Sequence, residues 1–497
     1  MGATLQRRIV IAVILIAAAI LVARLVIVAG DFSAIVTAAR FDELRDDRTA
    51  LRAFLHRMPK GGDLHVHLSG GVYAERLIAW AVEDGLCLRR SDMSIVDPPC
   101  DSAAGVATMS DVVGNQSSYD RLVDALSVRF FLPSPATPSA HDQFFGSFNR
   151  FGAASFRHAA DMTVDQLRRY QAENVQYAEL MMTFLPSGDR RALAERIKGQ
   201  TDFSMMLETL QRSGLERAVD GMRQRLADQV ARIDAMLDCD AERTRPGCGV
   251  SYRYIAQISR NEPLEEVFVQ TAAAAALVRA EPRVVAFNFV SPEDYQIARQ
   301  DYSEQMRMIG FLAQDVPVAL HAGELWLGLV PPEDLTFHIR AAVEVGGARR
   351  IGHGTAIAFE RDMDSLLAEL RRRPVTMEIS LTSSDLILNV RGKDHPLPTY
   401  LAAGVPVVLS TDDPGVERID LSNEYFRAAR DYNLGYRALK AIARNALTYS
   451  FLPPEEKQRQ LQRLDRASAD FERSVTGRRR QLQHLPILLK AAILPAS

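Results

Sequence analysis

The sequence predicts an α/β fold, a (β/α)8 TIM barrel with insertions after its first and second strands and an N-terminal signal or anchor helix. Short apolar runs alternate with helical stretches along most of the chain, and several runs are β-branched and apolar on both faces, as buried parallel strands are. Eight such units favour a closed barrel over an open doubly wound sheet. No glycine-rich phosphate loop follows the first run, which argues against dinucleotide binding.

The expected strands are short. They lie at Gly62–Leu68, Val175–Met182, Tyr252–Ser259, Val284–Val290, Val316–His321, Arg350–His353, Val375–Leu381 and Val405–Thr411. Amphipathic patterns between them predict helices, for example at Leu264–Ala280, Asp334–Val345 and Met363–Arg372. This alternation of strand and helix is what a parallel barrel requires.

Two long spacings between the expected strands predict insertions. Residues 69–165 follow the first strand, and residues 188–250 follow the second and contain a long charged helix. Insertions after barrel strands lie on the C-terminal face, where they roof the site, decorate the fold or make a dimer contact. The expected organisation is a signal peptide or membrane anchor at 1–30, an N-terminal helical segment at 31–57, the barrel at 58–450 and a C-terminal helical extension at 451–497.

The first thirty residues have the pattern of an export signal. Arg7 and Arg8 precede an apolar stretch, residues 9–29, in which Arg24 is the one charged residue. A basic start before such a stretch predicts either a cleaved secretion signal or an uncleaved membrane tether. The leading arginines favour an orientation that leaves the body of the chain outside. We therefore expect an exported protein, periplasmic or on the extracytoplasmic face of the membrane.

Cysteine spacing and charge constrain the partners. Cys87 lies close to Cys100, and Cys239 lies close to Cys248, each pair in a stretch of turn-forming residues. Neither pair has the spacing of a cysteine metal site, so two local disulfides in an oxidising compartment, or four free thiols, are the alternatives. The balance of 59 basic and 62 acidic residues predicts no nucleic-acid partner, because such domains are normally basic. The oligomeric state stays open.

Polar residues of catalytic type gather at the carboxyl ends of the apolar strands. His65 and His67 end the first strand, two residues apart and therefore on the same side of it. His321 and His353 end the fifth and sixth strands, and Asp412-Asp413 follows the eighth. Buried acids and histidines cost free energy unless they are paired or bound to a metal. Three imidazoles with a carboxylate suit zinc with an open position for water.

At these positions the chain resembles the adenosine deaminase family of metal-dependent hydrolases, in the amidohydrolase superfamily, and its exported or secreted branch. The carrying segments are Met58 to Lys60, Asp63 to Leu68, His321 to Glu324, Arg349 to Gly354 and Ser410 to Pro414, with weaker matches at Glu173 to Glu179 and His395-Pro396. Their order and spacing agree with the family from about residue 50 to 450. Each motif alone is a weak signal of the family. The combination is specific, because one motif stands at each expected strand end.

The resemblance implies a role for each residue of this set. The ligands of one Zn²⁺ per subunit would be His65, His67, His321 and Asp412. Glu324 would donate a proton to purine N1, which makes C6 electrophilic. His353 would orient the attacking hydroxide and stabilise developing charge, and Asp413 would help to hold it and contact N7. Addition at C6 and loss of ammonia would convert adenosine or 2′-deoxyadenosine into inosine or 2′-deoxyinosine.

The sequence departs from the family pattern in the loops expected to contact the nucleoside. Ser69 stands where many members have an Asp that reads the ribose 5′ hydroxyl, and Ser291 stands where a Gly commonly approaches purine N3. Thr382-Ser383-Ser384 replaces the more usual Ser-Asn after the seventh strand. Ser69, Ser291 and Asp413 are therefore the expected substrate contacts, and the reaction type is better determined than the substrate.

Three hypotheses follow. The first is an exported zinc-dependent deaminase of adenosine and 2′-deoxyadenosine that salvages purine nucleosides. The second is a related barrel deaminase or amidohydrolase that acts on another aminopurine, or on an amide or ester bond. The third is a non-catalytic extracellular binding protein that kept the fold, and the complete ligand set with Glu324 argues against it. An AMP deaminase is not expected, because no added phosphate-binding element is apparent.

Overall fold

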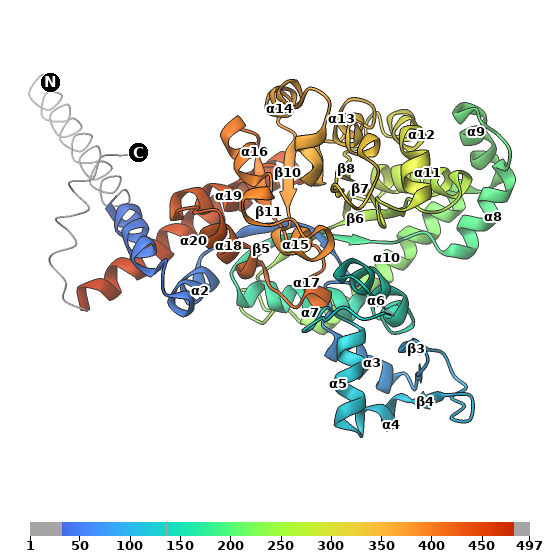
Figure 1. Ribbon diagram of the computed structural model, residues 1–497, viewed down its shortest axis with the longest axis horizontal. Coiled ribbons are helices and arrows are strands. Elements are labelled where there is room, and N and C mark those ends of the chain that lie inside the picture. Colours follow the sequence, from blue (N-terminus) through green and yellow to red (C-terminus); the bar gives the residue numbers. More distant parts are fainter. Residues whose placement is uncertain (1–31, 136, 482–497) are drawn as a thin grey trace, which may run out of the picture.

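The computed structural model describes residues 32–135 and 137–481 of the chain (Figure 1). The apolar stretch at 9–29, expected to be a signal or a tether, lies outside the described residues, as do residues 482–497. Within the described ranges, no helix combines the length and apolarity that a membrane span needs. Beyond the barrel the chain continues as one long helix, α20 (Pro454–Gln481).

Eight parallel strands form the centre of the fold. They are β1 (Gly61–His67), β5 (Val175–Met182), β6 (Ser251–Ser259), β7 (Val284–Val290), β8 (Ala319–Ala322), β9 (Arg350–His353), β10 (Thr376–Ile379) and β11 (Val407–Leu409). They pair as β1-β5-β6-β7 and as β8-β9-β10-β11. Parallel bridges between Val66 and Asp412 and between Phe287 and Val318 join the two sheets at both seams. The ring is therefore closed, as the apolar runs predicted.

Five of the eight strands differ from their expected limits, and the third strand starts at Ser251, one residue before the expected Tyr252. The fifth strand starts at Ala319 rather than at residue 316, and the eighth starts at Val407 rather than at residue 405. In each case a proline, Pro317 or Pro406, stands just before the strand and has no N–H for the ladder. The first strand starts and ends one residue earlier than expected. The seventh ends at Ile379, because the N–H of Leu381 already bonds to the Glu424 carboxylate in the first turn of α15 (Leu381–Leu388).

Two of the three helices named from the sequence are confirmed, α11 (Leu264–Ala280) and α14 (Met363–Arg372). The prediction of a single helix at Asp334–Val345 is wrong. The segment is divided into a 3-10 turn, η1 (Pro332–Leu335), and α13 (His338–Glu344). The carboxylate of Glu360 accepts the N–H groups of Ile339 and Arg340, so the first turn of α13 is capped from a distant residue and does not extend back to Asp334.

The segment between β1 and β5 contains a small antiparallel sheet that the sequence analysis missed. Its strands pair in the order β3-β2-β4, and it lies at the lower end of the molecule in Figure 1. The elements of this segment are α3 (Ala74–Glu83), β2 (Cys87–Arg89), β3 (Ser94–Val96), β4 (Val106–Thr108), α4 (Met109–Val113), α5 (Gln116–Ala125), α6 (Ala140–Ser155) and α7 (Ala159–Ala172). A disulfide joins Cys87 on β2 to Cys100, which follows β3.

Helices cover the outside of the barrel, so its strands are buried on both faces. They are α8 (Ser187–Ile197), α9 (Phe203–Ser213), α10 (Leu215–Leu237), α12 (Gln296–Leu312), α16 (Leu397–Ala403), α18 (Leu421–Asp431) and α19 (Tyr436–Thr448), with the short α17 (Pro414–Glu417), η2 (Thr355–Phe359) and η3 (Gly392–Asp394) in the loops. Residues 32–44 are helical and precede α2 (Arg48–Arg57), which packs against α18. All seven residues of β7 are buried, as a strand inside a barrel should be.

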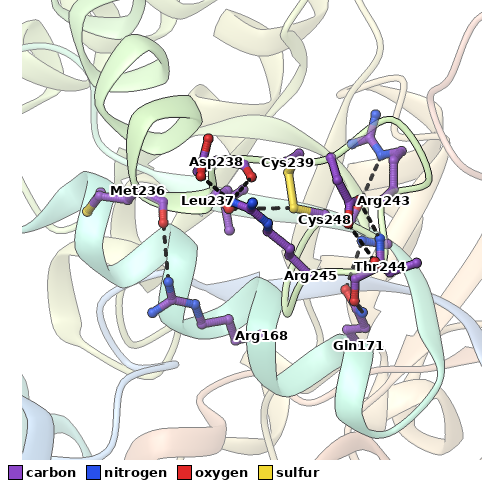
Figure 2. Close-up of a disulfide and its surroundings, with 12 residues drawn as sticks. Arg168, Gln171, Met236, Leu237, Asp238, Cys239, Arg243, Thr244, Arg245 and Cys248 are labelled. Carbon is purple, nitrogen blue, oxygen red and sulfur yellow. Dashed lines mark hydrogen bonds and ion pairs between the residues drawn. A yellow bond between two sulfur atoms is a disulfide. The ribbon is translucent and has the colours of Figure 1, made fainter.

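A second disulfide closes the turn between α10 and β6, and Figure 2 shows its surroundings. The sulfurs of Cys239 and Cys248 are bonded. Arg243 Nε donates to the Cys248 carbonyl at 2.6 Å, and Gln171 on α7 accepts the N–H of Gly249 at 2.8 Å. Both expected cysteine pairs are thus joined, and the four cysteines contain no free thiol.

Removal of the second disulfide should lower stability. Replacing Cys239 and Cys248 together with Ser frees the turn in the unfolded chain, where a loop of this size contributes about 2–4 kcal/mol. The thermal unfolding midpoint of the double variant should fall relative to the wild type under non-reducing conditions. Thiol labelling after denaturation and reduction should count four thiols in the wild type and two in the variant. An unchanged midpoint would mean that the hydrogen bonds to Arg243 and Gln171 hold the turn without the sulfur bridge.

Candidate metal centre

Four side chains from three parts of the barrel meet at one point. His65 and His67 lie on β1, His321 lies on β8, and Asp412 follows β11. Their ligand-type atoms all lie within 4.8 Å of one another. The Nε2 of His321 is 3.1 Å from that of His65 and 3.2 Å from that of His67, and Asp412 Oδ1 is 3.3 Å from both. The structure brings together the four residues that the sequence analysis named as ligands.

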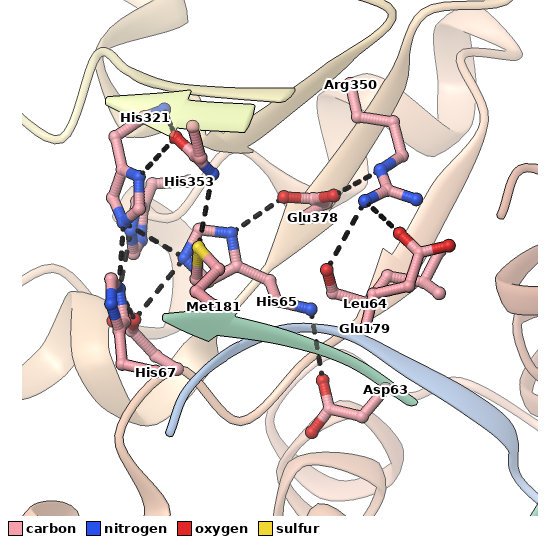
Figure 3. Close-up of polar contacts among 12 residues, drawn as sticks. Asp63, Leu64, His65, His67, Glu179, Met181, His321, Arg350, His353 and Glu378 are labelled. Carbon is pink, nitrogen blue, oxygen red and sulfur yellow. Dashed lines mark hydrogen bonds and ion pairs between the residues drawn. The ribbon is translucent and has the colours of Figure 1, made fainter. Parts of the chain in front are cut away.

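The opposite nitrogen of each ring is occupied by an acceptor. His65 Nδ1 lies 2.7 Å from a Glu378 carboxylate oxygen, as Figure 3 shows, and His67 Nδ1 lies 2.7 Å from Gln257 Oε1. His321 Nδ1 lies 2.9 Å from Asn288 Oδ1, which also accepts the His321 backbone N–H. In the neutral form of each ring, Nδ1 therefore carries the proton and Nε2 keeps its lone pair. In this form three lone pairs and a carboxylate oxygen face one another, an arrangement that a bound cation would stabilise.

The donor set fits zinc. Zn–N bonds of about 2.0–2.1 Å place neighbouring ligand atoms of a tetrahedron about 3.3 Å apart, close to the separations in this cluster. Asp412 Oδ1 is buried and has no hydrogen-bond partner among the described residues. Burial lowers the pKa of His321 well below its ordinary value, with a further contribution from His65, so its ring is neutral and able to bind a metal. His65, His67, His321 and Asp412 could hold one ion, with acceptors behind the rings that fix their orientation.

A chain of buried charges supports His65. Glu378 on β10 contacts His65 with one oxygen and Arg350 Nε with the other, at 2.6 Å. Arg350 also forms an ion pair with Glu179 on β5 at 2.6 Å, and all of these side chains are buried (Figure 3). Although burial alone would favour the neutral acid, Arg350 and His65 hold the pKa of Glu378 below its ordinary range. Glu378 is therefore a negatively charged acceptor behind the His65 ring.

Asp63 joins the ends of the first and last strands. Its carboxylate accepts the hydroxyl protons of Thr411 at 2.6 Å and Tyr170 at 2.9 Å. The backbone also crosses this seam, because the Asp412 N–H donates to His65 O and the His67 N–H donates to Asp412 O, both at 2.9 Å. Asp412 has a φ of +58°, in the left-handed region that non-glycine residues rarely adopt. The seam therefore determines where the Asp412 carboxylate points.

Two further polar side chains adjoin the cluster. His353 Nε2 at the end of β9 lies 3.6 Å from Glu324 Oε1 and 3.9 Å from Asp412 Oδ2. Both ring nitrogens of His353 and Oε1 of Glu324 are buried without a hydrogen-bond partner among the described residues. Burial, followed by the charges of Asp412 and Glu293, raises the pKa of Glu324 well above its ordinary value. Burial lowers the pKa of His353 to about 4, although Asp412 opposes the shift.

The backbone of Glu324 is held by a group that the sequence analysis missed. The Glu293 carboxylate accepts the N–H groups of Gly323 at 3.1 Å and Glu324 at 2.8 Å, and contacts His338 Nδ1 at 2.6 Å. Arg260 lies 3.7 Å from the same carboxylate and donates to the His321 carbonyl at 2.7 Å. Arg260 directly follows β6, and Glu293 comes three residues after the end of β7; a charge so close to the end of a strand was the signal available in the sequence.

Asp413 lies beside the cluster and is positioned by a glycine. It is 2% exposed, and its Oδ1 has no hydrogen-bond partner among the described residues. A Cβ added to Gly70 would come within 1.7 Å of that oxygen. Burial raises the pKa of Asp413 well above its ordinary value, the charge of His67 opposes the shift, and that of Asp412 adds to it. Gly70 therefore leaves the space that the Asp413 carboxyl group occupies.

The residues of the weaker motifs have separate places. Ser69 is half-buried in the turn after β1. Ser291 follows β7 with a φ of +82°, in the region that favours glycine, and its hydroxyl contacts Ser259 at 3.1 Å. Thr382 bonds to Glu424 rather than to the cluster. His395 accepts the N–H of Leu397 in the loop before α16. The roles expected for Ser69 and Ser291 stay predictions.

Comparison with known proteins identifies relatives of this chain. Residues 224–467 match the family model described as adenosine deaminase. Aminodeoxyfutalosine deaminase of Streptomyces coelicolor is 33% identical over 251 residues, which cover 49% of this chain and 59% of that protein. Adenosine deaminase of Enterococcus faecalis is 33% identical over 153 residues, 31% of this chain and 42% of that protein. The chain thus spans about half the length of these curated relatives.

Solved structures share the fold over most of the chain. Arabidopsis ADAL, solved in complex with IMP, aligns with a TM-score of 0.55 and 20% identity over 84% of this chain and 99% of that chain. A cog1816 amidohydrolase from Burkhoderia ambifaria with bound Zn aligns with a TM-score of 0.51 and 17% identity over 86% of this chain and 95% of that chain. At these identities the likeness establishes the fold alone.

The acceptor behind His65 should control metal affinity. Changing Glu378→Gln removes the charge that holds the His65 ring, and such supporting groups are typically worth about 10–100-fold in metal affinity. Competition with a chromogenic chelator should therefore show that the variant binds zinc more weakly than the wild type, although all four proposed zinc ligands are still present. Glu369→Gln, at an acid paired with Arg372 on the surface of α14, is the matched control and should bind zinc as the wild type does. Equal zinc affinities of the two variants would contradict the inference that Glu378 orients His65 for metal binding.

The space beside Gly70 should be needed for activity but not for metal binding. Gly70→Ala displaces the Asp413 carboxyl group, and misplacement of a site residue by about 1 Å can cost about 100-fold in rate. The zinc content should stay at one per chain, because Asp413 is not among the four ligands. Gly152→Ala is the control, since a Cβ there meets nothing within 4 Å. Full activity of Gly70→Ala toward the substrate would show that the position of Asp413 does not matter.

Proposed function

We propose that this relative of the adenosine deaminase family is a zinc-dependent hydrolase that deaminates adenosine and 2′-deoxyadenosine. The products would be inosine or 2′-deoxyinosine and ammonia. The observation that carries the proposal is the convergence of three imidazole lone pairs and the Asp412 carboxylate beside two unpartnered buried groups, Glu324 and His353. Metal ligands, a proton donor and a neutral imidazole are the groups that hydrolysis of an aromatic amine requires.

Glu324 is suited to donate a proton. Its carboxyl group is buried, has an unpartnered oxygen and is neighboured by the Asp412 and Glu293 carboxylates, all of which favour the protonated acid. In the proposed reaction it protonates N1 of the purine, and this draws electrons from C6. Water then adds to C6, one of its protons passes to the amino nitrogen, and the bond from C6 to that nitrogen breaks, so that ammonia leaves. The proton of the new C6 hydroxyl returns to Glu324, which gives the 6-oxo product. A zinc ion held by His65, His67, His321 and Asp412 would supply the nucleophile, because bound zinc lowers the pKa of water to about 7.

His353 and Asp413 are suited to handle the proton of the attacking water. His353 is neutral over the physiological range, since burial lowers its pKa, and it lies at 3.9 Å from the Asp412 carboxylate. A neutral imidazole at this position can accept a proton and carry positive charge as the oxygen adds to C6. The unpartnered Oδ1 of Asp413 is a second acceptor in the same region. Glu324 and His353 would thus act as a proton donor and a proton acceptor.

The substrate could be another aminopurine compound, and one observation favours keeping this second candidate. One of the relatives is an aminodeoxyfutalosine deaminase, which aligns at 33% identity over 251 residues. The same proton donor and metal ligands would serve any 6-aminopurine, because the chemistry occurs at N1 and C6. The complete set of metal ligands together with Glu324 argues against a non-catalytic binding protein.

We also propose that the enzyme works outside the cytoplasm. The basic start and apolar stretch at residues 9–29 have the pattern of an export signal or tether. Two disulfides join all four cysteines, and structural disulfides persist in oxidising compartments. A fusion of the first 45 residues to a reporter that is active only after export would test this placement, and a reporter without activity would contradict it.

Loss of the proton donor should abolish turnover and spare the metal. Glu324→Gln keeps the size of the side chain but cannot protonate N1, and general acid catalysis is typically worth about 10²–10⁴-fold. Ammonia release from adenosine should fall by that factor, with zinc content unchanged. Asp334→Asn, at a nearby acid paired with Arg299 outside the cluster, serves as the control for loss of charge.

The wild-type enzyme should be assayed with adenosine, 2′-deoxyadenosine, adenine, AMP and N6-methyl analogues. If the enzyme deaminates another aminopurine but not adenosine, the proposed substrate is wrong and the proposed mechanism is still supported. Undiminished turnover by Glu324→Gln would contradict the role of Glu324 itself.

A further inference from the structure

His338 is a buried imidazole that the proposed mechanism does not use. It is the first residue of α13 and is 1% exposed. Its Nδ1 lies 2.6 Å from an oxygen of the Glu293 carboxylate. Its Nε2 is buried and has no hydrogen-bond partner in the part of the chain that the structure describes. Because an ionised carboxylate can only accept hydrogen bonds, Nδ1 is the donor in the contact with Glu293.

Contacts on two sides fix the orientation of the His338 ring. The ring stacks on Tyr302 of α12, with the ring centroids 3.7 Å apart and the planes 18° apart, and the Tyr302 hydroxyl donates to the His338 carbonyl at 2.8 Å. The next N–H along the chain, that of Ile339, donates to the Glu360 carboxylate. Both the ring and the backbone of His338 are therefore held, and its Nδ1 is directed at Glu293.

Glu293 connects His338 to the proton donor. One of its oxygens accepts the His338 proton and the Gly323 N–H, and the other accepts the Glu324 N–H at 2.8 Å. Although burial alone would raise the pKa of Glu293, the hydrogen bond from His338 and the charge of Arg260 hold it below its ordinary value. Glu293 is therefore an ionised carboxylate that binds two successive backbone N–H groups directly after β8.

The turn that carries Glu324 also lies directly against α13. Gly323 has a φ of +72°, in the region that favours glycine, and a Cβ there would come within 2.7 Å of the Ile339 side chain. Two adjacent residues in the first turn of α13 thus adjoin this turn, Ile339 by packing and His338 through Glu293. The backbone position of Glu324 therefore depends on the start of α13.

We propose that His338 is a positioning residue for the proton donor: it holds the Glu293 carboxylate against the Gly323 and Glu324 N–H groups and so determines where the Glu324 carboxyl group lies. The inference rests on the proposed function, in which Glu324 protonates N1 of the purine. His338 is not one of the four proposed zinc ligands, so its loss should affect proton transfer and spare the metal. Misplacement of a catalytic group by about 1 Å can cost about 100-fold in rate.

Two variants at this position separate the hydrogen bond from the packing. His338→Phe keeps a ring to stack on Tyr302 and removes the donor. Its kcat for adenosine should fall about 10–100-fold with KM and zinc content unchanged, because only the proton transfer is impaired. His338→Asn keeps an N–H donor close to the position of Nδ1 and should recover most of the lost kcat. If neither variant changes kcat, or if His338→Asn loses as much as His338→Phe, the proposal is wrong.

The matched control is another histidine that stacks on an aromatic ring and contacts carboxylates. His158 stacks on Trp80, and its two ring nitrogens contact Asp84 and Asp161 in the segment between β1 and β5. His158→Phe should therefore keep the wild-type kcat. A lower thermal midpoint of both His338 variants with an unchanged kcat would give His338 a structural role alone and overturn the proposal.

A double-mutant cycle tests whether His338 acts through Glu293. Glu293→Gln keeps the size of the side chain, removes its charge and should lower kcat. Adding His338→Phe to Glu293→Gln should cause little further loss, because residues that act through one another are not additive. Losses in kcat that multiply in the double variant would show that the two residues act separately, and this result would overturn the proposal.

Amide hydrogen exchange separates this inference from the proposed function. Mass spectrometry of the wild type and the variants without substrate reports the protection of the Gly323 and Glu324 N–H groups. Faster exchange in His338→Phe but not in His338→Asn supports the inference even where adenosine is not deaminated. If the wild type deaminates adenosine but His338→Phe matches it in both exchange and kcat, the inference is wrong and the function stands.

Discussion

Three imidazole rings point their unprotonated nitrogens at one another because the other nitrogen of each ring is committed as a donor. Glu378, Gln257 and Asn288 accept these protons at 2.7 to 2.9 Å. The Asp412 carboxylate completes the cluster without a hydrogen bond for its Oδ1. Four such ligand atoms at about 3 Å from one another form a site that a metal cation would stabilise. The contacts at the C-terminal ends of the barrel strands hold these four side chains in place.

The barrel meets this need by placing charged networks between its strands. Glu378 and Arg350 connect β10 and β9 to the β1 histidine, and Asp63 joins β1 to the end of β11. Buried ion pairs of this kind add little net stability, since desolvation offsets much of the attraction, so their evident contribution is to orient the ligands. His353, with a φ of +67°, is one of several non-glycine residues in the left-handed region at strand ends. Such strain persists where the surrounding core determines the conformation.

The strands and the ligands could be predicted from the sequence because both have local signals. Apolar runs such as Val284–Val290 match a strand residue for residue, and polar residues at the ends of such runs meet in any parallel barrel. The supporting groups could not be predicted, because their partners are distant in sequence. Glu293 and His338 are 45 residues apart, and nothing in either segment names the other. The break before α13 has the same cause, since its cap, Glu360, comes from 21 residues downstream.

We expect the substrate to be selected by groups outside the metal cluster. Ser69 and Ser291 lie in the turns after β1 and β7, and Thr382 lies in the first turn of α15, so all three lie outside the strands that carry the cluster. Reaction type and substrate choice are therefore separable in this fold. The presence of a single zinc ion among three histidines and one aspartate is the premise of the proposed chemistry, and it can be tested without knowledge of the substrate.

X-ray absorption at the zinc edge of the purified protein tests that account most directly. It predicts one zinc per chain, with three nitrogen ligands at about 2.0–2.1 Å whose scattering is that of imidazole, and oxygen ligands at about 2.0–2.2 Å. Protein without a stoichiometric metal, or zinc whose nearest neighbours include fewer than three imidazoles, would contradict it.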